Sequence, residues 1–250
     1  MAFLDRSDAG RRLADKLSQV FTGTTIRRAV VEGMARGGIP VAFEIARSLR
    51  LPLDVVVVRK LGHPRQPELG LGAIGEDGVR VVNATLIEQL QVEDAVIDAV
   101  TSRESAELAR RVRTYRGDRS PVPLRERTAI VVDDGLATGF TARAAVEVMR
   151  RRGAARVVLA VPVGPPGAVT ALSRVADDVV CVEVTEHFFG ISEWYVDFHQ
   201  VRDEEVARLL EDAATFDDDE ASHDDARQDD ARQDDALGGH PRDGEGGRQP

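Results

Sequence analysis

The segment Ala129-Ile-Val-Val-Asp-Asp-Gly-Leu-Ala-Thr-Gly-Phe-Thr141 contains the residue types best suited to chemistry. Its apolar residues predict a strand, two adjacent carboxylates follow the strand, and a loop rich in Gly and Thr then leads into a predicted helix. Ligands of open α/β sheets bind at the carboxyl ends of strands. This segment therefore places its polar groups where such a sheet would hold a ligand.

The loop at 135–141 predicts a site for a phosphate group. It can direct several backbone N–H groups and the hydroxyls of Thr138 and Thr141 at one point, with the positive end of the following helix behind them. Asp133 and Asp134 stand in front of this loop, and paired carboxylates suit vicinal hydroxyls or a hydrated Mg2+. Together these groups predict a site for a phosphorylated sugar.

The elements that must position this site alternate along the chain between apolar strands and helices. That alternation predicts right-handed βαβ units and a mostly parallel sheet. A continuous β-branched run such as Val55–Val58 is typical of a strand covered on both faces. The expected strands are 28–33, 53–58, 128–132, 156–161 and 179–184. The expected helices are 9–20, 40–49, 85–115 with at most a brief interruption near Gln91, 139–151 and 203–212. Between them we expect a polar, Gly- and Pro-rich stretch at 63–72 and then a hairpin at 73–82.

The segment Ile130–Thr141 resembles the signature of the type I phosphoribosyltransferases, in which four apolar residues precede two acidic residues and a Thr/Gly-rich 5′-phosphate loop. Three further elements of that family fall in order, so the resemblance covers about residues 1–216. Met34-Ala-Arg-Gly-Gly38 is similar to the pyrophosphate loop. Arg59-Lys60 resembles the basic pair that reaches the pyrophosphate, and 61–82 lies where the family has its flexible lid.

This resemblance implies a three-layer α/β/α fold with a twisted, mainly parallel sheet and a small hood built from the N-terminal segment and residues 185–200. It also implies transfer of 5-phosphoribose from 5-phosphoribosyl 1-pyrophosphate (PRPP) to a nitrogen acceptor, with release of pyrophosphate. Mg2+ would be bound by Asp133 and Asp134, directly or through water, and the peptide bond next to Arg36 would be cis. The implied catalytic residues are Arg36, Lys60, Asp133 and Asp134, and the implied PRPP-binding residues are Arg36, Gly37, Gly38, Arg59, Lys60, Asp133, Asp134, Gly135, Leu136, Ala137, Thr138, Gly139, Phe140 and Thr141.

Residues 187–198 contain five of the eleven aromatic side chains of the chain. Core or interface packing is one interpretation of this density. In the resembled family the chain near this point helps to cover the nucleobase, often with an aromatic ring. The candidates for base contact are therefore Phe188, Phe189, Trp194 and Tyr195.

The acceptor does not follow from the sequence. Position 137 is Ala, whereas the 6-oxopurine enzymes of the family usually have Asp there, and no lysine follows Lys60 to reach a purine oxygen. A PRPP-binding regulator that has lost the transfer activity remains an alternative. A phosphoacceptor receiver domain is excluded, because that fold has its acidic pair after the first strand and a lysine late in the chain. The run Gly70-Leu-Gly-Ala-Ile-Gly75 matches a dinucleotide-binding pattern, but no strand is expected before it and no helix after it.

Charge and composition predict one domain, residues 1–216, followed by an acidic extension, residues 217–250. The extension holds ten Asp and two Glu against four Arg, and Leu237 is its only aliphatic residue larger than Ala, so we expect it to be disordered. The whole chain has a net charge of −10, of which only about −2 falls on residues 1–216, so a nucleic-acid partner is not expected. The single cysteine, the short apolar runs and the charged N-terminus predict a cytoplasmic protein without a membrane span. We expect it to act as a homodimer.

Overall fold

The computed structural model describes residues 3–21, 26, 28–214 and 216. The predicted acidic extension, 217–250, lies outside these residues. Within the described part of the chain, no helix is both long enough and apolar enough to cross a membrane.

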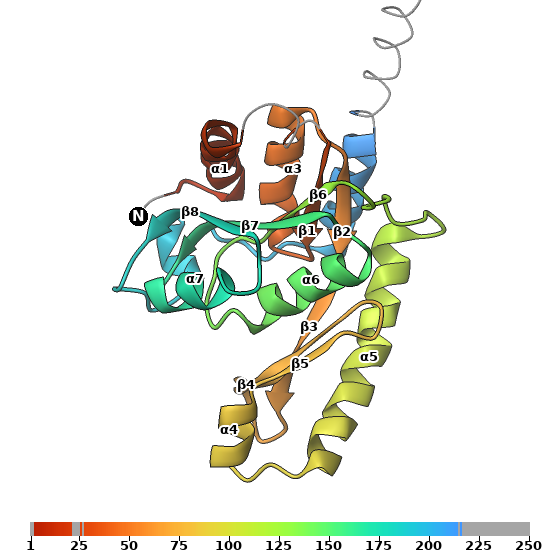
Figure 1. Ribbon diagram of the computed structural model, residues 1–250, viewed down its shortest axis with the longest axis vertical. Coiled ribbons are helices and arrows are strands. Elements are labelled where there is room, and N and C mark those ends of the chain that lie inside the picture. Colours follow the sequence, from red (N-terminus) through yellow and green to blue (C-terminus); the bar gives the residue numbers. More distant parts are fainter. Residues whose placement is uncertain (1–2, 22–25, 27, 215, 217–250) are drawn as a thin grey trace, which may run out of the picture.

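A five-stranded parallel sheet forms the centre of the protein, as the alternation of strands and helices predicts (Figure 1). Its strand order is β2-β1-β6-β7-β8, and each neighbouring pair is parallel. The strands are β1 (Ala29–Met34), β2 (Leu53–Val56), β6 (Thr128–Val132), β7 (Arg156–Gly164) and β8 (Asp178–Val184).

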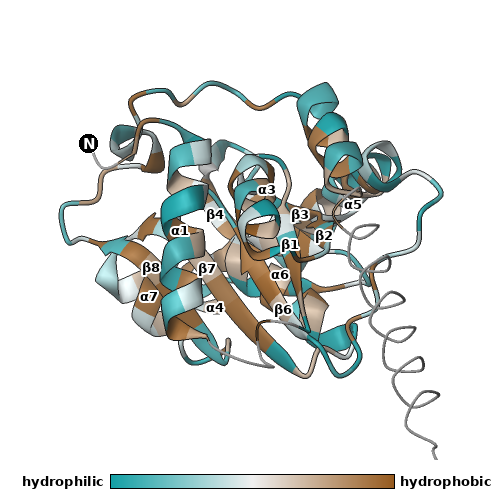
Figure 2. Cartoon of the chain, turned by 90° about the horizontal axis from the view of Figure 1, so that it is seen from above, coloured by the Kyte–Doolittle hydropathy of each residue, from teal (hydrophilic) through white to brown (hydrophobic). Residues whose placement is uncertain are grey.

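Helices cover both faces of this sheet, which completes the expected three layers. Because side chains alternate along a strand, Ile130 and Val132 pack against one pair of helices while Ala129 and Val131 pack against the other. Figure 2 shows the resulting apolar strands enclosed by helices whose outer faces are polar. The first pair is α1 (Arg6–Val20) and α3 (Gly38–Leu49), and the second is α6 (Phe140–Arg151) and α7 (Pro166–Leu172).

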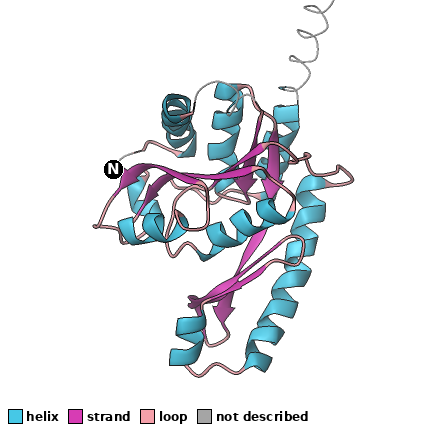
Figure 3. Cartoon of the chain, in the orientation of Figure 1, coloured by secondary structure: helices cyan, strands magenta, loops and turns pink. Residues whose placement is uncertain are grey.

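A separate three-stranded antiparallel sheet lies below the main body (Figure 3). Its strands are β3 (Val58–His63), β4 (Gln66–Gly75) and β5 (Arg80–Val82), and it is accompanied by α4 (Ala84–Gln89) and α5 (Asp94–Arg116). The prediction of an irregular stretch at 63–72 is wrong, because most of it forms β4. Its glycine and proline residues have low strand propensity, so the sequence did not indicate a strand. At Gly72 an added Cβ would lie only 2.2 Å from the Val81 carbonyl oxygen. Glycine at this position therefore permits the close strand contact.

Charged side chains fill the junction between the two sheets. Arg116, at the end of α5, lies 2.6 Å from the Glu76 carboxylate, and Arg152 reaches the same carboxylate at 2.7 Å. Asp54 of β2 lies 3.5 Å from the Arg116 Nε. Glu32 of β1 is fully buried beside this group, and among the described residues neither of its carboxylate oxygens has a hydrogen-bond partner.

Glu32 is the carboxyl group left without an ion pair among the described residues of this cluster, since Arg116 pairs with Glu76 and Asp54, and Arg152 pairs with Glu76 and Asp77. Its burial, and next the negative charge of Asp54, raise the pKa of Glu32 to about 8. Glu32 is therefore mostly protonated at neutral pH. We call Glu32, Asp54, Glu76, Arg116 and Arg152 the junction cluster.

The chain after β8 returns over the carboxyl end of the sheet as a 3-10 turn, η1 (Ile191–Trp194), and then a helix over 203–214. Phe3 pairs with Tyr195 in a parallel bridge, and their rings are 5.4 Å apart between centroids. The N-terminal segment and this later segment thus lie together, as expected for the predicted hood.

Candidate active site

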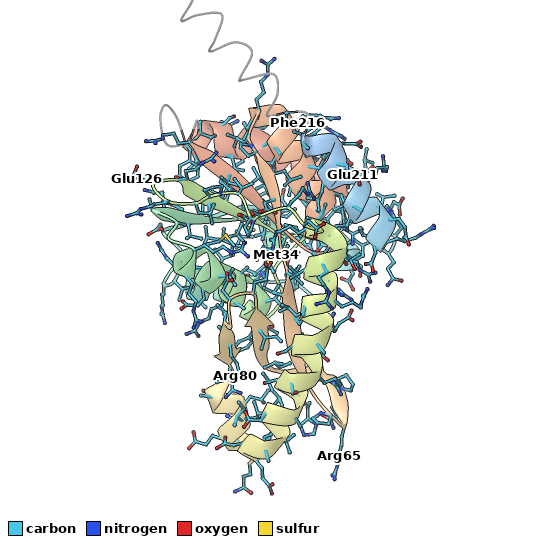
Figure 4. The ribbon with its side chains drawn as sticks, turned by 90° about the vertical axis from the view of Figure 1, so that its right-hand side faces the viewer. Met34, Arg65, Arg80, Glu126, Glu211 and Phe216 are labelled. Carbon is cyan, nitrogen blue, oxygen red and sulfur yellow. The ribbon has the colours of Figure 1, made fainter. Side chains whose placement is uncertain are left out.

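Two loops meet at the carboxyl ends of neighbouring strands. The loop after β1 contains Arg36 and Gly37, and the loop after β6 begins with Asp133 and Asp134; β1 and β6 are paired directly. Figure 4 places Met34, the last residue of β1, in the middle of the molecule. The candidate site therefore lies near the junction of the main body with the small sheet.

Glycine lets the first loop approach the second. A Cβ at Gly37 would lie 2.1 Å from the Asp134 Oδ2, and a Cβ at Gly38 would lie 2.4 Å from the Val132 carbonyl oxygen. A side chain at Gly37 would displace the Asp134 carboxylate, and one at Gly38 would displace the backbone at Val132 and Asp133. The Ala35–Arg36 peptide bond is cis, which confirms the expected peptide geometry beside Arg36.

Replacing Gly37 by alanine should therefore lower the free energy of unfolding by about 1–3 kcal/mol, the usual cost of overpacking. Urea unfolding measures this. The matched control is Gly167→Ala in α7, where an added Cβ has no described atom within 4 Å and the helix favours alanine. Equal stability of the Gly37 variant and the wild type would contradict the close contact between Gly37 and the Asp134 carboxylate.

The two carboxylates of the acidic pair have different surroundings. Asp133 Oδ1 accepts a hydrogen bond from the Asp134 backbone N–H at 2.9 Å. Asp134 is buried, and its Oδ2 accepts from the Arg6 Nε and lies 2.8 Å from the Arg6 Nη2. Asp134 is thus neutralised within the protein, whereas among the described residues no cation forms an ion pair with Asp133.

Burial disfavours the ionised form of both acids. It holds the pKa of Asp133 well above its ordinary value, and the negative charge of Asp134 adds to this effect. Burial also raises the pKa of Asp134, although Arg6 acts in the opposite direction. A cation or a developing positive charge beside the pair would stabilise the ionised forms.

Arg6 lines the candidate site and was not among the residues predicted from the sequence. Besides Asp134, its guanidinium donates to the His199 carbonyl oxygen at 2.8 Å and lies over the Phe198 ring, 3.9 Å from the centroid. Nothing in the sequence near Arg6 marks it, because its partners are 128 and 193 residues away. The chain has 31 arginines, so the residue type alone also does not distinguish Arg6 as a functional residue.

The predicted phosphate loop leads into α6, and its residues differ in whether they are buried and hydrogen-bonded or exposed. Leu136 is buried, and its N–H donates to the Val163 carbonyl oxygen at 2.8 Å, so this residue anchors the loop. Ala137 and Thr138 are exposed, and Gly139 has a positive φ of 80° directly before the helix. The N–H groups of a first helical turn lack acceptors within the helix. The predicted anion cradle is therefore narrowed to 137–141, because Leu136 is engaged with Val163.

The two predicted basic residues lie on the small sheet. The strand that was expected to end at Val58 is divided between β2 and β3, so Arg59 and Lys60 belong to β3 and not to the end of a main-sheet strand. Arg59 pairs with Glu104 of α5 at 2.7 Å. The structure brings Arg36–Gly38 and 133–141 together and leaves Arg59 and Lys60 on the separate sheet.

Three of the four predicted aromatic residues pack next to the site, and one of them holds the backbone of Asp134. The Tyr195 hydroxyl donates to the Asp134 carbonyl oxygen at 2.7 Å, and burial raises the pKa of Tyr195, so it stays a donor. Phe188 and Trp194 pack in the same cluster as Phe3, while Phe189 is 85% exposed.

A cavity of about 340 Å³ lies between the first loop, Asp134 and the returning chain. Phe198 is the aromatic side chain in its wall, so the four predicted base-contact residues do not include the ring that lines it. The residues that line the cavity are Arg6, Arg36, Gly37, Asp134, Phe198, His199, Gln200 and Val201.

Known proteins resemble this chain over most of its described length. Two Mycobacterium tuberculosis proteins, named provisionally as phosphoribosyl transferases, are each 50% identical over 211 residues, which cover 84% of this chain and 47% of theirs. The chain thus spans about half the length of these curated relatives. The crystal structure of the protein TT1426 from Thermus thermophilus is similar with a TM-score of 0.70 and 38% identity, covering 84% of this chain and 98% of that one. A uracil phosphoribosyltransferase of Lactobacillus gasseri is 29% identical over 169 residues, covering 63% of this chain and 74% of the relative.

The sequence profile of the phosphoribosyl transferase domain matches residues 3–199. This range begins at the Phe3–Tyr195 bridge and includes both loops, the acidic pair and most of the cavity wall. The chain belongs to the phosphoribosyl transferase domain family.

Proposed function

We propose that this protein transfers 5-phosphoribose from PRPP to a nitrogen acceptor and releases pyrophosphate. One observation carries the proposal: the loop at 35–38, the acidic pair and the Gly/Thr loop converge at the carboxyl ends of adjacent strands. PRPP carries a 5′-phosphate, two ribose hydroxyls and a pyrophosphate, and each of these groups has a matching element there.

The 5′-phosphate is bound by backbone N–H groups of 137–141 and the hydroxyls of Thr138 and Thr141, at the positive end of α6. Asp133 accepts hydrogen bonds from the ribose hydroxyls, since no cation in the described part of the chain forms an ion pair with it. Asp134, fixed by Arg6, adds negative potential beside it. Arg36 and the loop N–H groups bind the pyrophosphate, and we assign Arg59 and Lys60 of the small sheet to the same substrate group.

Cleavage of the bond between ribose and pyrophosphate builds positive charge on the ribose ring. Fixed negative groups aimed at that charge lower the barrier. The ionised form of Asp133 is disfavoured by burial without a ligand and becomes favourable as this charge develops, while Asp134 stays paired with Arg6. The acidic pair is therefore placed to bind the transition state more strongly than the ground state.

The acidic pair also fits a shared Mg2+. Among the described residues, the bonds above use one oxygen of each carboxylate, Asp133 Oδ1 and Asp134 Oδ2, and leave the other for Mg2+ or its water. No group of three or more His, Cys, Asp or Glu side chains in the described part of the chain could hold a metal alone. Mg2+ commonly binds one or two carboxylates together with substrate phosphates. When bound, it would neutralise the leaving pyrophosphate.

The acceptor we propose is a nucleobase. Support comes from the L. gasseri relative, whose name states that it acts on uracil. Further support is the cavity of about 340 Å³ beside Asp134, a volume within the range of small-ligand sites. Phe198 in its wall provides an aromatic surface, one face of which is covered by Arg6.

The test incubates the protein with PRPP, Mg2+ and one base at a time, and measures pyrophosphate. Release that depends on one base identifies a transferase and its acceptor. Asp133→Asn is the matched control, because it keeps the shape of the site and removes the carboxylate that faces ribose. PRPP binding without release for any base would favour the PRPP-binding regulator, and absence of PRPP binding would refute both.

We propose the same domain organisation that the sequence predicts. Residues 1–216 form the functional domain, and 217–250 are dispensable for PRPP binding. The homodimer and the cytoplasmic location also remain predictions.

A further inference from the structure

Arg36 of the first loop faces a carboxylate from the far end of the chain. Its Nη1 lies 3.5 Å from the Oδ1 of Asp203, the first residue of the helix over 203–214. The two side chains are 27% and 28% exposed, so solvent reaches both. The contact is long for a hydrogen bond, which leaves the guanidinium free to bind a stronger anion.

Asp203 is itself held firmly. The Tyr115 hydroxyl donates to the same Oδ1 at 2.6 Å, and the Arg110 Nη2 lies 3.7 Å from the Oδ2. Tyr115 is only 2% exposed, because it packs with Ile39 and residues of the 203–214 helix in one apolar cluster. The hydrogen bond from Tyr115, together with neighbouring arginines, lowers the pKa of Asp203. The carboxylate is thus an ionised and rigidly placed group.

We propose that Asp203, fixed by Tyr115, is a positioning residue that orients Arg36 toward the pyrophosphate of PRPP. The inference rests on the proposed function, in which Arg36 binds that pyrophosphate. An arginine has five donors, and Asp203 faces one of its terminal nitrogens, so the other donors can face the cavity that Arg36 lines. Orienting the side chain in advance reduces the rotamer entropy lost when the ligand binds.

The test compares three ligands by calorimetry in the presence of Mg2+: PRPP, inorganic pyrophosphate and ribose 5-phosphate. Asp203→Asn and Tyr115→Phe should each weaken PRPP and pyrophosphate by about threefold to fivefold, the range for a partly exposed charged contact. Ribose 5-phosphate should bind as in the wild type, because it lacks the group that Arg36 contacts. Glu204→Gln is the matched control, since it removes one charge from the next residue of the same helix, where the side chain is exposed.

A double-mutant cycle with Arg36→Ala tests whether Asp203 affects ligand affinity through Arg36. If Asp203 acts through Arg36, Asp203→Asn should change pyrophosphate affinity in the wild-type background and not in the Arg36→Ala background. Asp203→Glu should restore part of the loss.

Four results would overturn the inference: unchanged affinity, tighter binding, equal loss for ribose 5-phosphate, or an undiminished effect without Arg36. Tighter binding would show that Asp203 competes with the ligand instead. A wild-type protein that fails to bind PRPP would refute the proposed function as well. If Arg36→Ala weakens PRPP binding and Asp203→Asn does not, the positioning role alone would be refuted.

Discussion

Replacing Glu32 by glutamine should stabilise the protein, and the gain should grow with pH. The folded-state pKa of Glu32 is raised to about 8 from an ordinary value of 4.5. Between these values the folded chain keeps a proton that the unfolded chain has released, so stability falls as pH rises through this window. Glutamine has the same shape and does not titrate. The variant should therefore match the wild type below pH 4.5 and exceed it by roughly 5 kcal/mol above pH 8.

The measurement is urea unfolding of both proteins from pH 4.5 to pH 9. The informative quantity is the difference in the free energy of unfolding between the two proteins at each pH, because other titrating groups affect both equally. Glu147→Gln in α6 is the control, since its side chain is 51% exposed and its difference should not follow pH in this way. If Glu32 were instead ionised and held by Arg116 and Arg152, the glutamine variant would be less stable than the wild type at pH 7.

Asp134→Asn should destabilise the protein by about 3–5 kcal/mol, because it removes one partner of a buried ion pair. The side chains of Arg6 and Asp134 are only 7% and 12% exposed. Arginine cannot lose its charge in a protein, so the buried guanidinium would be left without a counter-ion. Thermal or urea unfolding at pH 7 measures the loss.

The reverse variant, Arg6→Gln, should cost less at acid pH, because Asp134 can become neutral by binding a proton. Combining Arg6→Gln with Asp134→Asn should recover part of the stability that the aspartate variant loses. Asp178→Asn is the matched control: it breaks a partly exposed pair with Arg156, with side chains 32% and 44% exposed, and should cost less than about 1 kcal/mol. Equal losses for Asp134→Asn and Asp178→Asn would contradict the buried pair described here.

The sequence allowed the fold class and the centre of the site to be predicted, because both depend on local patterns. Runs of β-branched residues alternate with helical periodicity, and that is enough to specify a parallel α/β sheet. The segment Ile130–Thr141 carries its strand, acidic pair and loop in one continuous stretch. No distant contact is needed to recognise it.

The parts that were missed depend on contacts between distant residues or on glycine. Arg6 is part of the site only because the returning chain brings Phe198 and His199 against it. The small sheet contains glycines that lower strand propensity and yet permit close packing, as at Gly72. The aromatic density at 187–198 was noticed, but periodicity does not tell which ring lines a cavity.

The placement of Arg6 has a consequence for the order in which a growing chain completes this site. A ribosome adds about 5–20 residues per second, so roughly ten seconds or more separate the synthesis of Arg6 from that of His199. Until then helix α1 can dock on the sheet only without the parallel bridge between Phe3 and Tyr195. The cavity wall at 198–201 also forms only after this point. The candidate site is therefore among the last parts of the protein to be completed, because a chain released before Tyr195 would contain the residues of all five central strands but not those that finish this site.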